Sequence, residues 1–203
     1  MSALRYAVLG FRGVLALDGE DARAFLQGLV SNDVTKVNPS RAVYAALLTP
    51  QGKFLHDFFV AEVAGALLLE CEKARIGDLK RRLGLYKLRA KVTLDDRSDA
   101  FAVAALFGEG VLDALGLPGE AGTARAFAGG VVFADPRVAA AGARAIAPKD
   151  GFRAATAQAG FAETNAAEYD QARIALGLPD GSRDLEIEKA ILKSDLGLNP
   201  TND

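Results

Sequence analysis

At 203 residues, about half of them hydrophobic and a quarter charged, the chain has the composition of a globular protein large enough to bury a core. The net charge of −2 gives no overall attraction to nucleic acid or a membrane, and no run of about 20 apolar residues or apolar N-terminal leader indicates a membrane span or a signal peptide. A single cysteine, Cys71, and a single histidine, His56, exclude an intrachain disulfide and supply no Cys/His ligand set for a metal, so we expect a reducing, cytoplasmic location and no metal site.

The first elements expected are strands within residues 5–17, interrupted at Gly10 and Gly13, and a helix over about residues 20–30. Apolar residues recur in this helix at helical spacing and form one buried stripe. The triplet Ser-Asn-Asp at 31–33 ends the helix, because these side chains bond to their own backbone and favour turns.

Residues 42–60 form the most strongly patterned stretch and predict two apolar strands joined by a tight turn. Pro50 suits the first central position of the turn because its ring fixes φ, and Gly52 permits a positive φ just after it. The remaining residues are mostly aromatic or aliphatic, so both strands are expected to be buried.

Two adjacent ionisable residues, His56 and Asp57, interrupt this apolar hairpin. Neighbours on a strand face opposite sides of the sheet, so the two side chains cannot form one site. We expect one of them to face the same way as Leu55 and Phe59, where a charge is costly without a partner or a ligand.

After the hairpin, residues 66–71 predict a third strand and residues 73–84 a helix ended by Gly84. Residues 86–94 alternate between apolar side chains and mostly basic ones, which predicts a fourth strand. Residues 42–94 are therefore expected to form an antiparallel sheet with a helix on it.

Eight basic residues and one acidic residue, Asp78, lie between positions 73 and 91, giving this basic segment a local charge of +7. Such a run is either a solvated face or an anion-binding surface. Phosphates, nucleic acid, a polyglutamate tail or another polyanion, or an acidic partner would fit the second interpretation.

The second half predicts strands at 100–107, 131–133 and 143–147 and helices at 109–115, 151–159 and 165–176, with a loop at 117–130. The fold class expected is α+β, with two subdomains that each combine an antiparallel sheet and helices. Residues 1–41 plus 95–192 would form the first subdomain, 42–94 an inserted second one, and 193–203 a tail.

Three blocks in order resemble the YgfZ-type folate-binding proteins, relatives of the glycine cleavage system T-protein, an aminomethyltransferase. They are Phe-Leu-Gln-Gly-Leu-Val-Ser-Asn-Asp-Val at 25–34, the hairpin region 45–57, and residues 173–185, which contain Gly-Leu-Pro-Asp-Gly-Ser-Arg-Asp-Leu. Family members continue into a Lys-Gly-Cys-Tyr-x-Gly-Gln-Glu signature and a small barrel domain. The last residues here, 196–203, do not match, so a truncated, frame-shifted or naturally short member is expected.

The resemblance implies tetrahydrofolate bound in a central channel. In the T-protein the matching hairpin ends in a Gly-Gly-x-x-Asp-Asp pattern, and Asp57 falls on the second Asp, a folate contact, while His56 replaces the first and Lys53 the second Gly. A carboxylate there can accept hydrogen bonds from the cofactor nitrogens and favour a developing positive charge, so Asp57 is the candidate catalytic and cofactor-binding residue. Tyr44 and Arg173 are the other candidate cofactor-binding residues.

Each of these residues also has a purely structural interpretation. Asp57 could bond a neighbouring backbone or arginine, Tyr44 could be a core residue of its strand, and Arg173 could pair with Asp170. For His56, an ordinary hydrogen-bonded histidine is favoured over catalysis, because no second ligand or base is visible near it.

The resemblance implies a tetrahydrofolate-binding factor that supports iron–sulfur cluster assembly or repair and, through it, tRNA modification. Its partners would be folate and iron–sulfur client enzymes or assembly proteins. The alternative is an enzyme, a folate-dependent aminomethyltransferase of the T-protein type, which retention of Asp57 also permits.

Overall fold

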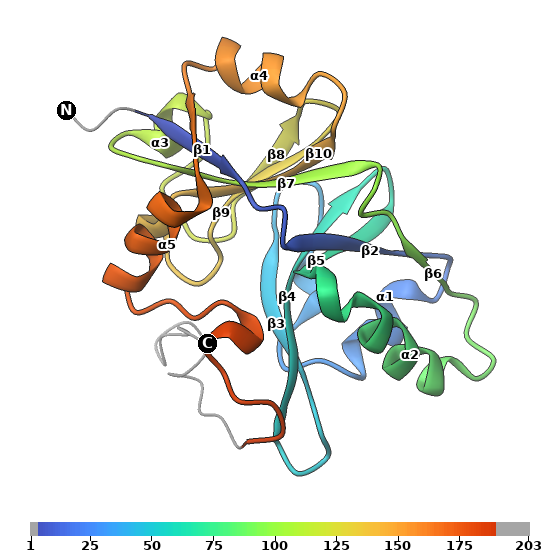
Figure 1. The fold of residues 1–203 in the computed structure, drawn as a ribbon. Coiled ribbons are helices and arrows are strands. Elements are labelled where there is room, and N and C mark those ends of the chain that lie inside the picture. The colour runs from blue at the N-terminus through green and yellow to red at the C-terminus, as the bar shows by residue number, and fades with distance from the viewer. Residues whose placement is uncertain (1–3, 190–203) are drawn as a thin grey trace.

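The apolar strands pair into two sheets in the computed structural model, which describes residues 4–189 (Figure 1). The first sheet has the order β11-β1-β7-β10-β9-β8 and is formed by β1 (Arg5–Val8), β7 (Phe101–Phe107), β8 (Ala124–Phe127), β9 (Gly130–Ala134), β10 (Ala143–Pro148) and β11 (Ala162–Thr164). The second has the order β3-β4-β5-β2-β6 and is formed by β2 (Arg12–Asp18), β3 (Val43–Leu48), β4 (Phe54–Val63), β5 (Ala66–Glu72) and β6 (Thr93–Asp96). The expected α+β class is confirmed.

Helices lie against the outer faces of both sheets, so the apolar core has three layers. One layer joins the second sheet to α1 (Ala22–Gln27) and α2 (Ile76–Lys87). The middle layer lies between the two sheets, with α5 (Ala166–Ala175) at its side. The third joins the first sheet to α3 (Val111–Ala114) and α4 (Phe152–Gln158). Short 3₁₀ turns complete the chain: η1 (Val34–Lys36), η2 (Lys73–Arg75), η3 (Ala139–Ala141) and η4 (Gly181–Arg183).

The hairpin forms as expected, with Gly52 at φ +77° in the turn between β3 and β4. A β-bulge follows the turn: Leu47 lies opposite His56 and Leu48 opposite Phe54, so Leu55 is the extra residue. The bulge places Leu55 in the helix-side core, whereas Phe59 lies between the sheets. The expectation that these two share a face is therefore wrong, because the alternation of a strand is broken at a bulge.

The predicted boundary at Gly84 is also wrong, since α2 continues to Lys87 and residues 86–92 are not a strand. A glycine inside a helix costs only about 1 kcal/mol, and the residues around it are good helix formers. The helix ends at Leu88, which has φ +43° and is 90% exposed. The strand that follows is β6, which pairs with β2.

The strand pairing differs from the grouping expected for residues 1–41. Hydrogen bonds place β2 between β5 and β6, so residues 12–18 lie in the same sheet as the hairpin. The β2–β5 pairing joins strands about 50 positions apart, which local patterns do not reveal. Two strands, β8 and β11, lie where no strand was expected, and β11 runs parallel to β1. The division into subdomains stays a prediction.

No helix within residues 4–189 is both long and apolar enough to cross a membrane. The expected tail, 193–203, lies outside the described residues.

Candidate functional site

Asp57 and Tyr44 meet between the two sheets. They lie on the neighbouring strands β4 and β3, and the Tyr44 hydroxyl donates a hydrogen bond of 2.7 Å to Oδ2 of Asp57. Tyr44 is 0% and Asp57 4% exposed. Burial and the neighbouring Asp57 carboxylate raise the pKa of Tyr44 well above its ordinary value, so its hydroxyl stays a neutral donor. The structure thus brings together two of the three residues expected at the site.

Arg12 lies beside this pair and joins it to the C-terminal part of the chain. It forms ion pairs with Glu70 on β5 and, at 3.0 Å, with Oδ1 of Asp180, just before η4. Burial alone would lower the pKa of Arg12, but the surrounding carboxylates of Glu70, Asp57 and Asp180 outweigh it and raise the pKa. Arg12 therefore stays charged and holds η4 against the second sheet.

A second set of buried charges continues from Glu70 into the first sheet. Arg144 on β10 donates to Glu70 at 2.9 Å and to the Tyr169 hydroxyl at 2.6 Å. The guanidinium of Arg137 donates two hydrogen bonds to Asp135, of 3.0 and 2.7 Å, and its backbone N–H a third, of 3.0 Å. Burial opposes ionisation of Asp135, but the two arginines outweigh it and lower its pKa. Both sheets are thereby linked by charge pairs through the middle of the core.

Aromatic rings lie against these arginines. The guanidinium carbon of Arg144 is 4.1 Å from the ring centre of Phe59, and that of Arg137 is 5.0 Å from the same ring and 5.3 Å from the Tyr44 ring. Such contacts favour the charged guanidinium where water is excluded. The Nε atom of Arg144 has no hydrogen-bond partner within residues 4–189.

Asp57 differs from the other buried carboxylates. Glu70, Asp135 and Asp180 each form an ion pair with a buried arginine. Asp57 forms none within the described residues, and its Oδ1 atom accepts no hydrogen bond there. A buried carboxylate with a free acceptor oxygen is the arrangement that a ligand with N–H donors can complete. We call Arg12, Tyr44, Asp57, Glu70 and Asp180 the Asp57 cluster.

Gly181 in η4 approaches Asp57 closely. Its φ is +56°, and a Cβ placed on it would lie 3.0 Å from Oδ1 of Asp57 and 3.3 Å from Oε2 of Glu72. The neighbouring Ser182 hydroxyl hydrogen-bonds Glu72 at 2.8 Å. A side chain at position 181 would therefore press on the carboxylate, so glycine keeps this approach open.

Arg173 is buried in the last turn of α5. Among the described residues its hydrogen bonds do not reach Asp57 or Tyr44. It pairs with Asp170 at 2.7 Å and with Asp184 at 2.5 Å and donates to the Leu178 carbonyl at 2.9 Å. Asp184 in turn accepts from the backbone N–H of Asp180 at 2.9 Å. Arg173 therefore fixes the segment that carries Asp180 and Gly181. Its assignment as a cofactor ligand stays a prediction.

His56 lies on the opposite face of β4, as expected from strand alternation. Its Nε2 is 2.9 Å from Oδ2 of Asp78 on α2. Burial, helped by Arg75 and Arg82, lowers the pKa of His56 although Asp78 acts in the other direction. It is a hydrogen-bonded core histidine at the helix–sheet contact.

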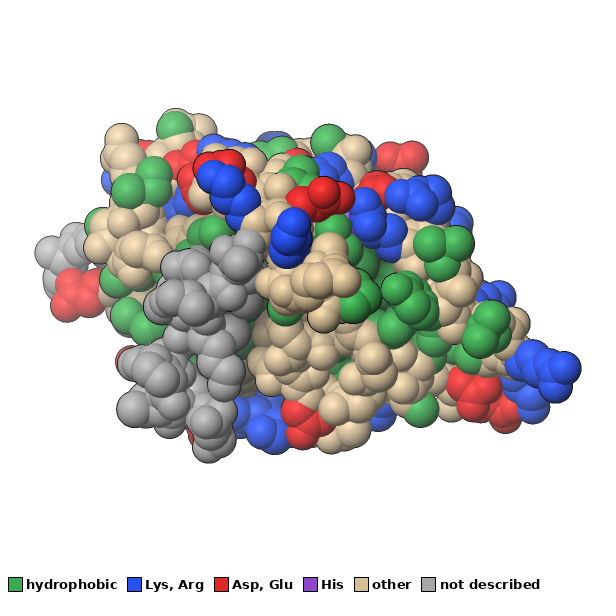
Figure 2. Space-filling model, turned by 90° about the horizontal axis from the view of Figure 1, so that it is seen from below, with side chains coloured by type: hydrophobic (Ala, Val, Ile, Leu, Met, Phe, Trp, Pro, Cys, Tyr) green, Lys and Arg blue, Asp and Glu red, His purple; other side chains and the backbone are tan. Residues whose placement is uncertain are grey.

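The basic segment, residues 73–91, covers η2, α2 and the turn that follows. Arg81 and Arg82 pair with Asp78 at 2.5 and 2.6 Å, so Asp78 balances part of the positive charge of the basic segment. Large apolar side chains are exposed beside the basic ones, and Figure 2 shows green and blue side chains together at its right, where α2 lies in Figure 1. These are Leu85, 67% exposed, Tyr86, 53%, and Leu88, 90%.

Several residues of the site were missed by sequence reasoning. Glu70 and Arg144 are charges between apolar neighbours inside strands, and Arg12 is the first residue of β2. This signal was available in the sequence but does not reveal which charges meet. Gly181 belongs to the third resemblance block, yet only the fold brings it to Asp57.

The chain belongs to the GCVT N-terminal domain family, whose model matches residues 11–116. Over 192 residues it is 32% identical to the mitochondrial iron–sulfur cluster assembly factor IBA57 of Homo sapiens, covering 86% of this chain and 51% of that protein. The IBA57 homologue of Pyricularia oryzae is 28% identical over 190 residues, covering 92% and 46%. The chain thus spans about half the length of the curated relatives it matches.

Among solved structures, aminomethyltransferase T of the glycine cleavage system from Bartonella henselae matches with a TM-score of 0.72 and 17% identity, covering 91% of this chain and 54% of that chain. At this identity the likeness concerns the fold. The resemblance to T-protein relatives is confirmed at the level of family and fold, and the assignment to the YgfZ type stays a prediction.

Proposed function

We propose that this chain binds tetrahydrofolate at the Asp57 cluster and supports iron–sulfur cluster assembly or repair, and through it tRNA modification. Two findings support the proposal. The curated relatives that match most of the chain are named as iron–sulfur cluster assembly factors. The single structural observation that carries it is Asp57, a buried carboxylate without an arginine partner among the described residues.

The residues present fit a folate cofactor. Asp57 offers Oδ1 as an acceptor for ring or linker N–H groups, and Tyr44 holds the other carboxylate oxygen in place. Gly181 lies close to Oδ1 and has no side chain to press on it. When bound, tetrahydrofolate supplies the one-carbon chemistry, while these residues orient it and exclude water.

Calorimetry of the 203-residue chain with tetrahydrofolate tests the site. Asp57→Asn should weaken binding by about tenfold or more, because a hydrogen bond to a charged acceptor is worth about 1.5–3 kcal/mol. His56→Asn, on the same strand but the opposite face, is the matched control and should leave the affinity unchanged. Equal affinity for the wild type and Asp57→Asn would refute the assignment.

The cellular role is tested separately by deleting the gene and restoring it. The wild type should restore the cluster content of iron–sulfur enzymes and the modified nucleosides of tRNA, measured by mass spectrometry, and Asp57→Asn should not. Full restoration by Asp57→Asn would separate the cellular role from folate binding.

An aminomethyltransferase remains the second candidate, because the sequence resemblance aligns Asp57 with the second Asp of the T-protein hairpin. The two proposals differ in the fate of the cofactor. A transferase converts tetrahydrofolate to a one-carbon derivative during turnover, whereas a binding factor returns it unchanged. Chromatography of folates after incubation with an aminomethyl donor distinguishes them.

A further inference from the structure

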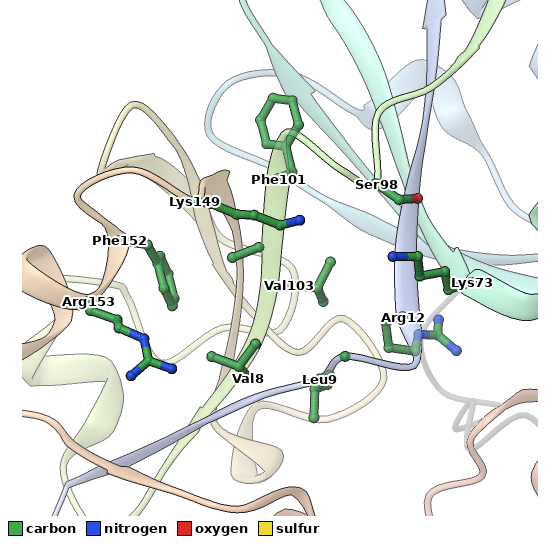
Figure 3. A pocket seen from close by; sticks show the side chains of 12 residues that line it. Val8, Leu9, Arg12, Lys73, Ser98, Phe101, Val103, Lys149, Phe152 and Arg153 are labelled. Atoms are coloured by element: carbon green, nitrogen blue, oxygen red, sulfur yellow. The ribbon is translucent and has the colours of Figure 1, made fainter.

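A cavity of about 290 Å³ lies at the junction of the two sheets, and Arg12 of the Asp57 cluster borders it (Figure 3). Four separate stretches of chain line it: residues 8–12 between β1 and β2, Lys73 in η2, residues 98–103 at the start of β7, and residues 149–153 at the start of α4. Asp57 and Tyr44 do not line it. The proposed folate site therefore does not account for this cavity.

The charges around the cavity have one sign. Four basic side chains and no carboxylate are among its described lining residues. Two of the four are already paired: Arg12 with Glu70 and Asp180, and Arg153 with Glu163 at 2.9 Å. Of the other two, Lys73 forms one long ion pair and Lys149 forms none within residues 4–189, so their amino groups are the most available to a ligand.

Lys73 and Lys149 are weakly engaged by the protein. The Nζ atom of Lys73 is 3.7 Å from a carboxylate oxygen of Asp99, whose side chain is fully exposed, and such pairs contribute little. Lys149 forms no ion pair within residues 4–189. Figure 3 shows the two amino groups pointing toward each other from opposite sides of the cavity.

Most of the remaining wall is apolar. Leu9, Val103 and Phe152 are 1%, 3% and 1% exposed, and the partly buried Phe101 also lines the cavity. Binding sites for small organic molecules combine such apolar walls with a few convergent polar groups. At about 30 Å³ for a water-sized group, the volume holds on the order of ten non-hydrogen atoms.

We propose that this cavity binds a small organic anion, with its phosphate or carboxylate between Lys73 and Lys149 and its apolar body against Phe101 and Phe152. The proposal does not rest on the proposed function: Arg12 borders both sites but is paired with Glu70 and Asp180, and neither lysine belongs to the Asp57 cluster. Phosphate and carboxylate are one chemistry here, an oxyanion accepting from two ammonium groups.

Phenyl phosphate is the probe, since it has eleven non-hydrogen atoms, and benzoate, inorganic phosphate and benzyl alcohol are its comparisons. We expect phenyl phosphate or benzoate to bind in a titration followed by calorimetry, inorganic phosphate to bind at least tenfold more weakly, and benzyl alcohol not to bind. The preferred anion of the first two identifies the head group. If inorganic phosphate binds as tightly as phenyl phosphate, the apolar wall has no part in binding and the proposal is wrong.

Lys149→Met and Lys73→Met should each weaken binding of the preferred anion by about tenfold, the loss expected for one charge-assisted hydrogen bond. Lys80→Met is the matched control, because Lys80 is exposed on α2, away from the cavity, and should change nothing. All three are surface substitutions, and thermal melting verifies that each variant folds. The proposal is overturned if no probe binds at millimolar concentration. It is also overturned if Lys73→Met and Lys149→Met reduce the affinity no more than Lys80→Met does.

Gly10 offers a steric test that leaves the charges intact. It lines the cavity, and a Cβ placed on it meets no heavy atom within 4 Å. The Cβ itself meets open space, and Gly10→Leu, once thermal melting shows that it folds, should reduce phenyl phosphate binding by extending into the cavity that Gly10 lines. Unchanged binding in this variant would place the ligand elsewhere on the surface.

Discussion

Replacing two buried carboxylates one at a time separates the ligand site from the framework that holds it. Glu70 is 0% exposed and pairs with both Arg12 and Arg144, whereas Asp57 accepts only from Tyr44 among the described residues. Glu70→Gln keeps the shape but leaves two buried guanidinium groups short of a counter-charge. Breaking a buried pair in this way costs about 3–5 kcal/mol.

Asp57→Asn should cost far less. The Tyr44 hydroxyl can still donate to the amide oxygen, so a charge-assisted bond becomes a neutral one, a loss of about 1 kcal/mol. Arg12 loses part of the negative charge around it but keeps its ion pairs with Glu70 and Asp180. The free energy of unfolding should therefore fall by only about 1 kcal/mol.

Circular dichroism during thermal unfolding measures both changes. For a domain of this size, 1 kcal/mol shifts the melting temperature by about 2–4 °C. Glu70→Gln should thus lower it by about 6–20 °C and Asp57→Asn by less than about 4 °C. A loss in Asp57→Asn as large as that in Glu70→Gln would show that Asp57 is part of the framework and would refute its role as a ligand-binding group.

Three further outcomes are expected. Because the pKa of His56 is lowered in the folded chain, the unfolded chain takes up a proton first as pH falls below about 6.5, so the His56 contribution to stability is full above that pH and declines below it. The single histidine signal in NMR should titrate with a midpoint below 6.5, and a higher midpoint would contradict the buried environment. Gly181→Ala should lower stability by about 1–2 kcal/mol and also weaken folate binding. Gly177→Ala, also at positive φ but with no atom near its Cβ, should lower stability alone. Equal folate affinities in the two variants would show that a side chain at position 181 does not disturb Asp57. Reversing Arg81, Arg82 and Arg89 to Glu should abolish a salt-dependent affinity for polyglutamate, and unaltered affinity would mean that the basic segment is only a solvated face.

The sequence predicts those parts of the fold that depend on neighbours along the chain. The hairpin follows from Pro50, Gly52 and the apolar runs beside them, and the start of α5 from Asn165, whose side chain accepts from the Glu168 N–H. The end of α2 could not be predicted, because the residues after Gly84 suit a helix and a strand equally well. Only the contacts of the folded chain decide between them.

Within the candidate site, too, only the contacts between neighbouring strands of one hairpin could be predicted. Tyr44 and Asp57 could be expected together, because a hairpin places them on adjacent strands. The Arg12–Glu70 pair depends on β2 lying beside β5. The contact of Arg12 with Asp180 depends on a segment that lies 168 positions away in the chain. Such pairings are set by the packing of the two sheets, which no local pattern in the sequence encodes.

The two sheets also differ in when their strands become available during synthesis on the ribosome. All five strands of the second sheet lie within residues 12–96, whereas the first sheet needs β1, at residues 5–8, and β11, at residues 162–164. Chains emerge from the N-terminus at about 5–20 residues per second, so β11 follows β1 after about 8–30 s. The second sheet, which carries Asp57, can therefore form first, and the first sheet can complete its pairing and pack against it afterwards.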